Sequence, residues 1–351
     1  MSGKRRLLGL ILLVIASYFG LPLWALITLA VLILIVVFLV IPSIFHWSFT
    51  VQRHMIFLPW VKWPKLVDFD HPEEQGLEGT INFYLESEEG IKVGVWHVLP
   101  MSMLHQSANQ NLEWYQKSLG QGQPVVIYMH GNTGSRARDH RISMYQVLRK
   151  LGYHIICFDY RGYADSSPVM PTKRGVIQDG KTVIRYVRNH CGSVPIIIWG
   201  HSLGSSVSTH IVSDLSVEGN PPQALILESP FNNIKDEIRA HPMTWIWRKM
   251  PMFDWFFTGT LDHSDVGFQS DQCIQHIHVP LLILHAKDDL VIPFHLGKKL
   301  YQRAQETRLS HSKPVKMISF EESDGFAHIF IHTSPEVPKL VSEFIKDSLH
   351  L

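Results

Sequence analysis

Apolar residues fill the first part of the chain without a break, whereas further on they alternate with polar residues or gather in short runs. From Leu7 to Phe45 no residue is charged. One helical crossing of a bilayer takes roughly 20 apolar residues, so this stretch is about twice the length needed. A cleaved signal peptide would be shorter and would end in small residues, but Leu23 to Ile41 continues in Leu, Ile and Val. Residues 1–46 are therefore predicted to form a membrane anchor.

The number of crossings depends on Gly20-Leu21-Pro22. This tripeptide is either a turn between two short spans or a kink before one long span, Leu23 to Phe45. Lys4, Arg5 and Arg6 precede the apolar stretch, and the positive-inside rule then places the N-terminus in the cytosol. A single crossing would put the rest of the chain in the lumen or outside, and a hairpin would return it to the cytosol.

Residues 47–79 mix tryptophan and phenylalanine with arginine and lysine before a polar stretch. This composition is typical of a segment that lies along the headgroup region, and a packed linker with core aromatics is the alternative. Residues 80–351 are predicted to form one globular domain.

Two kinds of strand pattern follow. Alternation of apolar and polar residues in Ile81 to Leu85 and in Val93 to Val98 predicts an antiparallel hairpin. Met101 to Gly122 is polar, and we expect an irregular surface excursion there. Later runs are apolar at almost every position and alternate with helical segments, which is typical of a parallel sheet covered by helices on both faces. These runs are Val125 to Met129, Ile155 to Phe158, Ile196 to Trp199, Ala224 to Leu227, Leu281 to Leu284 and Val315 to Phe320. The fold class is therefore α/β, a doubly wound, mostly parallel sheet.

The interval 232–272 is too long for one crossover helix and is rich in tryptophan, phenylalanine and methionine. We expect it to be a helical lid over an apolar pocket or a surface that dips into the membrane. A helical excursion that packs on its own core is the alternative.

Composition excludes several classes of partner. The chain has 32 basic and 31 acidic side chains and a net charge of +1, so neither a nucleic-acid partner nor a polycation is expected. Its three cysteines are far apart, and the close histidine pairs lack accompanying carboxylates or thiolates, so no metal site is expected. The phosphate-binding G-x-x-x-x-G-K-[ST] pattern is absent. We expect no cofactor.

The apolar run Ile196 to Trp199 leads directly into Gly200-His201-Ser202-Leu203-Gly204. The pattern G-x-S-x-G after a strand is typical of a nucleophile elbow, in which a serine sits on a strained turn and the glycines let neighbouring backbones pass closely. The following helix, predicted over Leu203 to Val212, would direct its positive end toward an anion formed beside Ser202.

A serine nucleophile needs a base and an acid, which follow it in the order serine, acid, histidine in this fold. Asp288 and Asp289 come just after the run Leu281 to Leu284, and His328 lies in the loop after Val315 to Phe320. Their joint appearance in this order predicts a catalytic triad. Glu228, at another strand end, is a rival acid.

An oxyanion hole needs backbone N–H groups from the residue after the nucleophile and from the loop after an earlier strand. Leu203 supplies the first. The loop His130 to Gly134 follows Val125 to Met129, with Asn132 or Thr133 as the second donor.

Four basic side chains follow this loop closely and are candidates for binding a phosphate or carboxylate on the substrate. A solvated helix start is the alternative. They are Arg136, Arg138, His140 and Arg141. Arg161 is expected instead to fix the loop after its strand.

From about Asp68 onward the chain resembles the membrane-anchored α/β-hydrolase-domain lipases that act on lysophosphatidylserine and monoacylglycerol. The resemblance implies that Asp289 rather than Asp288 is the triad acid and that His328 rather than His332 is the base. It also implies an integral enzyme of the endoplasmic reticulum membrane with its catalytic domain in the lumen, although this chain contains no N-x-[ST] glycosylation acceptor. The matching segments are Gly94 to His97, His130 to Asn132, Phe158 to Gly162, Trp199 to Gly204, Leu225 to Phe231, Phe253 to Phe257 and Leu281 to Asp289.

Our hypothesis from the sequence is a serine hydrolase with Ser202, Asp289 and His328 as its triad and Leu203 and Asn132 as oxyanion donors. Its substrates would be lysophospholipids and monoacylglycerols taken from the membrane. An acyl-thioesterase with the same triad, and a catalytically silent membrane scaffold, are the alternatives.

Overall fold

The computed structural model describes residues 22–309 and 312–349. In this part of the chain eight strands form one sheet in the order β1-β2-β4-β3-β5-β6-β7-β8. β1 pairs antiparallel with β2, and β2 with β4, while the neighbours from β4 to β8 are parallel. The predicted doubly wound sheet with an antiparallel start is confirmed. The strands are β1 (Thr80–Glu88), β2 (Ile91–Val98), β3 (Val125–Met129), β4 (His154–Phe158), β5 (Ile196–His201), β6 (Ala224–Glu228), β7 (Leu281–Ala286) and β8 (Val315–Phe320).

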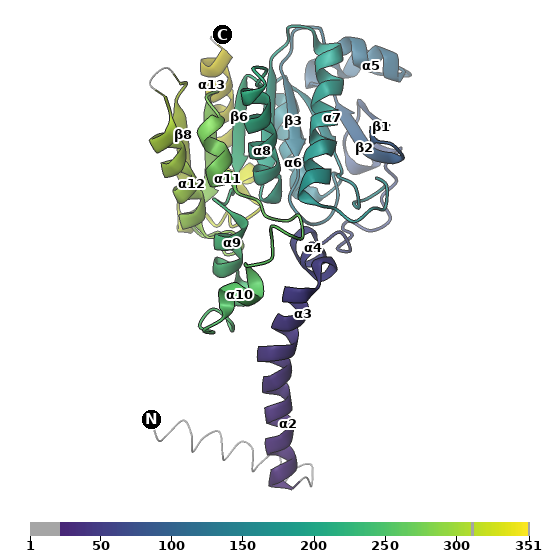
Figure 1. The fold of residues 1–351 in the computed structure, drawn as a ribbon. Helices are drawn as coiled ribbons and strands as arrows, with labels where there is room; N and C mark the ends of the chain where they lie inside the picture. Colours follow the sequence, from purple (N-terminus) through teal and green to yellow (C-terminus); the bar gives the residue numbers. More distant parts are fainter. Residues whose placement is uncertain (1–21, 310–311, 350–351) are drawn as a thin grey trace.

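Helices cover both faces of the sheet, as wholly apolar strands require. In β3, Val125 and Ile127 pack with α7 and α8, whereas Val126 and Tyr128 pack with α6 on the opposite face. Figure 1 shows α7 and α8 on the near side of the sheet and α6 behind it. The helices of the first face are α7 (Lys173–Cys191), α8 (Leu203–Val217) and α12 (Phe294–Thr307), and those of the second are α6 (Asp139–Lys150) and α13 (Val337–Leu349).

The segment 101–122 is more regular than expected, and the prediction of an irregular excursion is wrong there. It contains the 3-10 turn η3 (Met101–Gln106) and the helix α5 (Leu112–Ser118). Asn111 caps α5 by accepting the N–H of Trp114 at 3.0 Å, and Tyr115 packs against a small apolar cluster. A helix of two turns is stabilised mainly by such packing, so its sequence carries little periodic signal.

One long apolar helix precedes the sheet. It runs from Leu23 to Trp47 as α2 (Leu23–Ile35), the π-helical turn η1 (Val36–Val40) and α3 (Ile41–Trp47). Its 25 residues span about 37 Å, which exceeds the ~30 Å of bilayer hydrocarbon. Figure 1 shows it projecting away from the globular part.

Among the described residues this is the one helix that fits a transmembrane segment by length and composition. It coincides with the long span predicted after Pro22. Lys4, Arg5, Arg6 and the apolar residues up to 21 lie outside the described residues, so the choice between a single span and a hairpin stays a prediction.

The linker after the anchor contributes to the core as well as to the surface. Helix α4 (Phe49–Phe57) follows α3, and its Ile56 and Phe57 are buried in the main core cluster. Trp47, Trp60 and Trp63 are exposed. The packed-linker interpretation of 47–79 therefore fits Ile56 and Phe57, and the headgroup interpretation stays a prediction. The further short turns are η2 (Pro72–Gln75), η6 (Glu322–Asp324) and η7 (Ile331–Thr333).

The segment 232–272, which we call the lid insertion, leaves β6 and leads to β7. It carries short helices rather than a long one, and Phe253, Phe256 and Phe257 are buried in the main core cluster. Trp245 and Met252 are exposed. Whether the segment moves as a lid stays a prediction. Its elements and the turns that follow are α9 (Ile234–Ala240), η4 (Pro242–Thr244), α10 (Phe253–Phe257), α11 (Ser270–Cys273) and η5 (Ile274–His276).

Candidate active site

Ser202 occupies the turn between β5 and α8, with φ 53° and ψ −120°. A Cβ atom on Gly200 would lie 2.2 Å from Oγ of Ser208, and one on Gly204 would lie 2.0 Å from the carbonyl oxygen of Met129. No side chain fits at either position. The close approach that the G-x-S-x-G spacing predicts is confirmed, and it holds Ser202 in a conformation that L-residues rarely adopt.

The backbone around Ser202 favours an anion. Leu203 is the first residue of α8, so its N–H has no intrahelical acceptor and lies at the positive end of the helix. The N–H of Ser202 donates to the carbonyl of Glu228 at 3.0 Å, which ties the turn to the neighbouring strand. The free donor next to the nucleophile is therefore that of Leu203.

His328 and Asp289 are in direct contact, since Nδ1 of the imidazole lies 2.7 Å from Oδ2 of the carboxylate. The other oxygen of Asp289 accepts the N–H groups of Val291 at 2.9 Å and Ile292 at 2.8 Å. Burial alone would raise the pKa of Asp289, but hydrogen bonds from His285 and His328 hold it well below its ordinary value. Asp289 is thus an ionised group that fixes His328 through Nδ1 and leaves Nε2 for proton transfer.

Asp288 has a different position. Both of its carboxylate oxygens accept the N–H of Ala327, each at 3.0 Å, and Ala327 has φ 47°. His201 donates from Nε2 to the carbonyl of His328 at 3.0 Å. Asp288 and His201 therefore hold the backbone on either side of the His328 side chain, while Asp289 contacts the side chain itself.

The rival candidates have other partners. Glu228 accepts the indole N–H of Trp199 at 2.9 Å, and burial raises the pKa of this carboxyl to about 7. His332 donates from Nδ1 to the carbonyl of Ile329 at 3.0 Å. The structure does not bring Glu228 to His328, so it offers no support for Glu228 as the acid.

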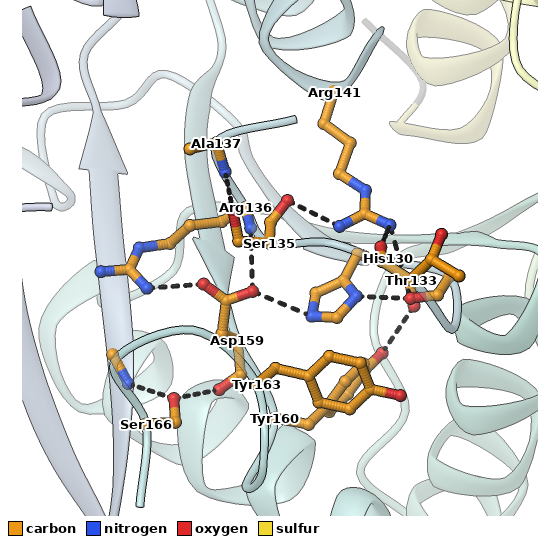
Figure 2. Close-up of polar contacts among 12 residues, drawn as sticks. His130, Thr133, Ser135, Arg136, Ala137, Arg141, Asp159, Tyr160, Tyr163 and Ser166 are labelled. Atoms are coloured by element: carbon orange, nitrogen blue, oxygen red, sulfur yellow. Dashed lines mark hydrogen bonds and ion pairs between the residues drawn. The ribbon is translucent and has the colours of Figure 1, made fainter. Parts of the chain in front are cut away.

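The candidate oxyanion loop, residues 130–134, is fixed from behind by the network drawn in Figure 2. His130 donates from Nδ1 to the carbonyl of Gly131 at 2.6 Å, and its Nε2 lies 3.2 Å from Oδ1 of Asp159. Arg141 donates to the carbonyls of Thr133 and Ser135, both at 2.6 Å. Burial and the nearby Arg141 lower the pKa of His130, whereas Asp159 and the bond to Gly131 act in the opposite direction.

Of the two candidate donors in that loop, Asn132 lies beside the nucleophile. Asn132 and Ser202 line the same two cavities, whereas Thr133 lines one of them. A Cβ on Gly131 would be 3.2 Å from Cβ of Ser202, which shows how close the loop passes. The side chain of Asn132 donates to the carbonyl of Ile56 at 3.0 Å and so fixes the loop to α4.

The four basic side chains after this loop separate into two groups. Arg136 is fully buried and pairs with Asp159 and Asp165, each at 2.6 Å. Arg136 lines neither cavity at Ser202, so the prediction of a ligand role is wrong for this arginine. Arg138, His140 and Arg141 line a cavity with Ser202, and their ligand role stays a prediction.

Arg161 has the structural role that the sequence suggested. Its guanidinium pairs with Asp179 at 2.7 Å and with Glu88 at 2.6 Å.

Two cavities meet at Ser202. The first, about 320 Å³, is lined mainly by apolar side chains of α3, α4 and the lid insertion. The second, about 460 Å³, is lined by Arg138, His140, Asp288 and His328 among others. Ser202, Asn132, Leu58, His241 and Val291 line both. In the described ranges no group of three or more His, Cys, Asp or Glu side chains could hold a metal ion.

Several positioning contacts were not foreseen. Tyr163 donates its hydroxyl to the carbonyl of Phe57, and the N–H of Gly134 donates to the carbonyl of Val61 at 3.0 Å. Glu237 of α9 is buried in the wall of the apolar cavity. These contacts join segments far apart in the chain, so no local sequence pattern predicts them.

Comparison with known proteins places this arrangement in a family. Residues 124–256 match the α/β hydrolase fold family. The lysophosphatidylserine lipase ABHD12 of Danio rerio is 43% identical over 310 residues, which cover 88% of this chain and 81% of that protein. This chain belongs to the ABHD12 family. The Gallus gallus ABHD12 is 42% identical, covering 88% of this chain and 81% of that protein, and the human protein ABHD12B is 34% identical, covering 83% and 79%.

Solved structures share the fold of this ABHD12-family chain at low sequence identity. The Pyrococcus furiosus esterase PF2001 superimposes with a TM-score of 0.58 at 20% identity, over 82% of this chain and 97% of that one. An α/β hydrolase from Vibrio vulnificus gives 0.60 at 16% identity, over 85% and 92%. Together with the sheet order, they show the α/β-hydrolase fold.

Proposed function

We propose that this chain is a membrane-anchored serine hydrolase that cleaves acyl esters of single-chain lipids, namely lysophospholipids of the lysophosphatidylserine type and monoacylglycerols. Its family membership makes it a carboxylic ester hydrolase. One observation carries the finer statement: Ser202 lies where an apolar cavity meets a second cavity whose lining includes the ionic side chains Arg138 and Asp288. A single-chain lipid has its ester at the same boundary, between acyl chain and head group.

The contacts support a conventional sequence of steps. Oγ of Ser202 attacks the ester carbonyl while Nε2 of His328 takes its proton, and Asp289 stabilises the resulting imidazolium. The N–H groups of Leu203 and Asn132 bind the oxyanion. His328 then gives the proton to the departing glycerol oxygen. Water, activated by His328 in turn, releases the fatty acid and restores Ser202.

The second cavity at Ser202 supports an ionic head group. Arg138 and Asp288 line it with charges of opposite sign. A phosphoserine group carries a phosphate and a carboxylate that would pair with an arginine, and an ammonium that would pair with a carboxylate. Relatives named lysophosphatidylserine lipases are consistent with this choice.

We further propose that the protein resides in the endoplasmic reticulum membrane with its catalytic domain in the lumen. Among the described residues, the helix Leu23–Trp47 is long enough for one crossing. Protease added to sealed microsomes should leave the domain intact. Its digestion without detergent would contradict the luminal orientation and favour the hairpin.

The activity is tested with purified full-length protein in lipid nanodiscs. Substrates are lysophosphatidylserine, monoacylglycerol, a palmitoylated peptide and an acyl-coenzyme A, and Ser202→Ala is the control. We expect turnover of the two oxygen esters that S202A abolishes. Turnover confined to the thioesters would replace the lipase with a thioesterase. Failure of the folded protein to react with a fluorophosphonate would favour the silent scaffold.

A further inference from the structure

One wall of the apolar cavity at Ser202 comes from the membrane helix itself. Ile41, Ile44 and Phe45 of α3 line it. Ile41 is 42% exposed and Ile44 is 50% exposed, and Met243 of the lid insertion, which also lines the cavity, is 58% exposed. Because these side chains face the cavity and the surroundings at once, the cavity opens between α3 and the lid insertion.

The opening lies on the membrane side of the helix end. Tryptophan favours the headgroup level, and the exposed Trp47 closes the apolar helix. Ile44 and Ile41 precede it by three and six residues, so they lie about 5 and 9 Å deeper along the helix. Trp245 and Met252 of the lid insertion are exposed as well, as suits a surface in contact with lipid.

The lid insertion is bonded to the same helix at this depth. The indole N–H of Trp247 donates to the carbonyl of Val37 at 2.8 Å, and Nδ1 of His46 donates to the carbonyl of Trp255 at 2.6 Å. Val37 precedes Trp47 by ten residues, or about 15 Å along the helix. In Figure 1, α10 lies beside α3 below the globular part. Both walls of the opening therefore extend into the hydrocarbon layer.

We propose that the acyl chain of the substrate enters sideways from the bilayer between α3 and the lid insertion, and that the membrane helix forms one wall of the acyl-binding site. This inference rests on the proposed function. Only the ester and head group of the lipid then leave the membrane to reach Ser202, and the acyl chain passes from the bilayer into the cavity without contact with water. Ile41 and Ile44 become determinants of chain specificity, and the anchor becomes part of the active site.

The test is Ile44→Trp in the full-length protein, which fills the opening from the helix side. We expect kcat/KM for 1-oleoylglycerol to fall by about tenfold or more, because the added ring overfills the cavity. Hydrolysis of p-nitrophenyl acetate, which has no long chain, should change less than about twofold. The matched control is Leu39→Trp, on the same helix, exposed and outside the cavity lining.

Equal losses on both substrates, equal losses in I44W and L39W, or no loss in I44W would overturn the inference while leaving the hydrolase itself in place. A wild-type protein that hydrolyses p-nitrophenyl acetate but no lipid would instead remove the proposed function and this inference with it.

A second measurement needs no variant. A fluorophosphonate with a long alkyl chain that ends in a diazirine is allowed to react with the wild-type protein in nanodiscs and is then irradiated. We expect cross-links to Ile41–Phe45 or to the lid insertion. Cross-links confined to Leu290, Ile329 and Phe330, which line the second cavity at Ser202, would contradict the proposal.

Discussion

The indole N–H of Trp247 donates to the backbone carbonyl of Val37, 210 residues earlier, inside the long apolar helix Leu23–Trp47. In the π-helical turn there, each N–H reaches the carbonyl five residues before it, as that of Ile41 does with Val36. The next residue is Pro42, which has no N–H, so the carbonyl of Val37 lacks a donor within the helix. An unpaired carbonyl in hydrocarbon is costly, and Trp247 removes that cost. The same bond fixes the lid insertion to the anchor.

A double-mutant cycle tests this relationship. Trp247→Phe keeps an aromatic ring but removes the donor, and should lower Tm of the full-length protein in nanodiscs by about 2–6 °C, as expected for one unsatisfied buried carbonyl. Pro42→Ala supplies a backbone N–H in the helix. In the Pro42→Ala background, W247F should lower Tm by clearly less than it does in the wild type. Equal losses of Tm in both backgrounds would refute the proline-based explanation.

The adjacent aspartates should differ in their effects on catalysis. Asp289→Asn removes the charge that holds His328, and kcat should fall by roughly three to four orders of magnitude. Asp288→Asn keeps an oxygen that accepts the N–H of Ala327, so we expect a loss below about tenfold. Steady-state kinetics on monoacylglycerol measures both, with circular dichroism to check the fold. A larger loss in D288N than in D289N would reverse the assignment of the triad acid.

Arg138 should discriminate between head groups. Arg138→Gln is expected to lower kcat/KM for lysophosphatidylserine by about 10- to 100-fold, which is the range for one lost charged hydrogen bond. The kcat/KM for monoacylglycerol should change by less than about twofold. The control is Arg185→Gln, an exposed arginine of α7 that lines neither cavity. A parallel loss on both lipids would show that Arg138 only supports the oxyanion loop through its hydrogen bond to Thr133.

Glu237 should make stability depend on pH. Burial in the apolar cavity wall raises the pKa of this carboxyl to about 8. Between its ordinary pKa and 8 the unfolded chain gives up the proton while the folded chain keeps it, so the free energy of unfolding falls as pH rises through this window. The glutamine in Glu237→Gln does not titrate. The Tm of this variant should therefore increase relative to the Tm of the wild type from pH 5 to pH 8.

Differential scanning fluorimetry at pH 5, 6, 7 and 8 measures that gain. Glu113→Gln, at an exposed carboxyl paired with Lys117 on α5, is the control and should show little change with pH. A constant difference between E237Q and wild type would contradict the role of Glu237 as a neutral buried acid.

Much of the sheet was predictable because strand burial leaves a local pattern. Val125–Met129 occurs with the predicted bounds, since parallel strands covered on both faces must be apolar at every position. Val315–Phe320 does so too, although this strand lies at the edge of the sheet and exposes Lys316 and Ser319. The bend at Ser202 was predictable for the same kind of reason: Gly200 and Gly204 are the residues that such close backbone contacts require.

The environment of the site was less accessible from sequence. Periodicity indicates which face of an element is buried but not which partner it meets. Arg136 looked like a ligand-binding cation, yet its guanidinium group is used by Asp159 and Asp165. The hydrogen bonds from Asn132 to Ile56 and from Trp247 to Val37 span 76 and 210 residues, and no spacing rule encodes them.

The central proposal is that Ser202 carries the acyl group during turnover. The direct measurement is acid quenching of the wild-type protein within milliseconds of mixing with 1-oleoyl-lysophosphatidylserine, followed by digestion and mass spectrometry of the peptides. We expect an oleoyl adduct on the peptide that contains Ser202. The adduct should accumulate in the variant His328→Gln, in which deacylation is slow, when this variant is given an activated oleoyl ester as substrate. An adduct on another residue, or lipid turnover that persists in Ser202→Ala, would contradict the proposal.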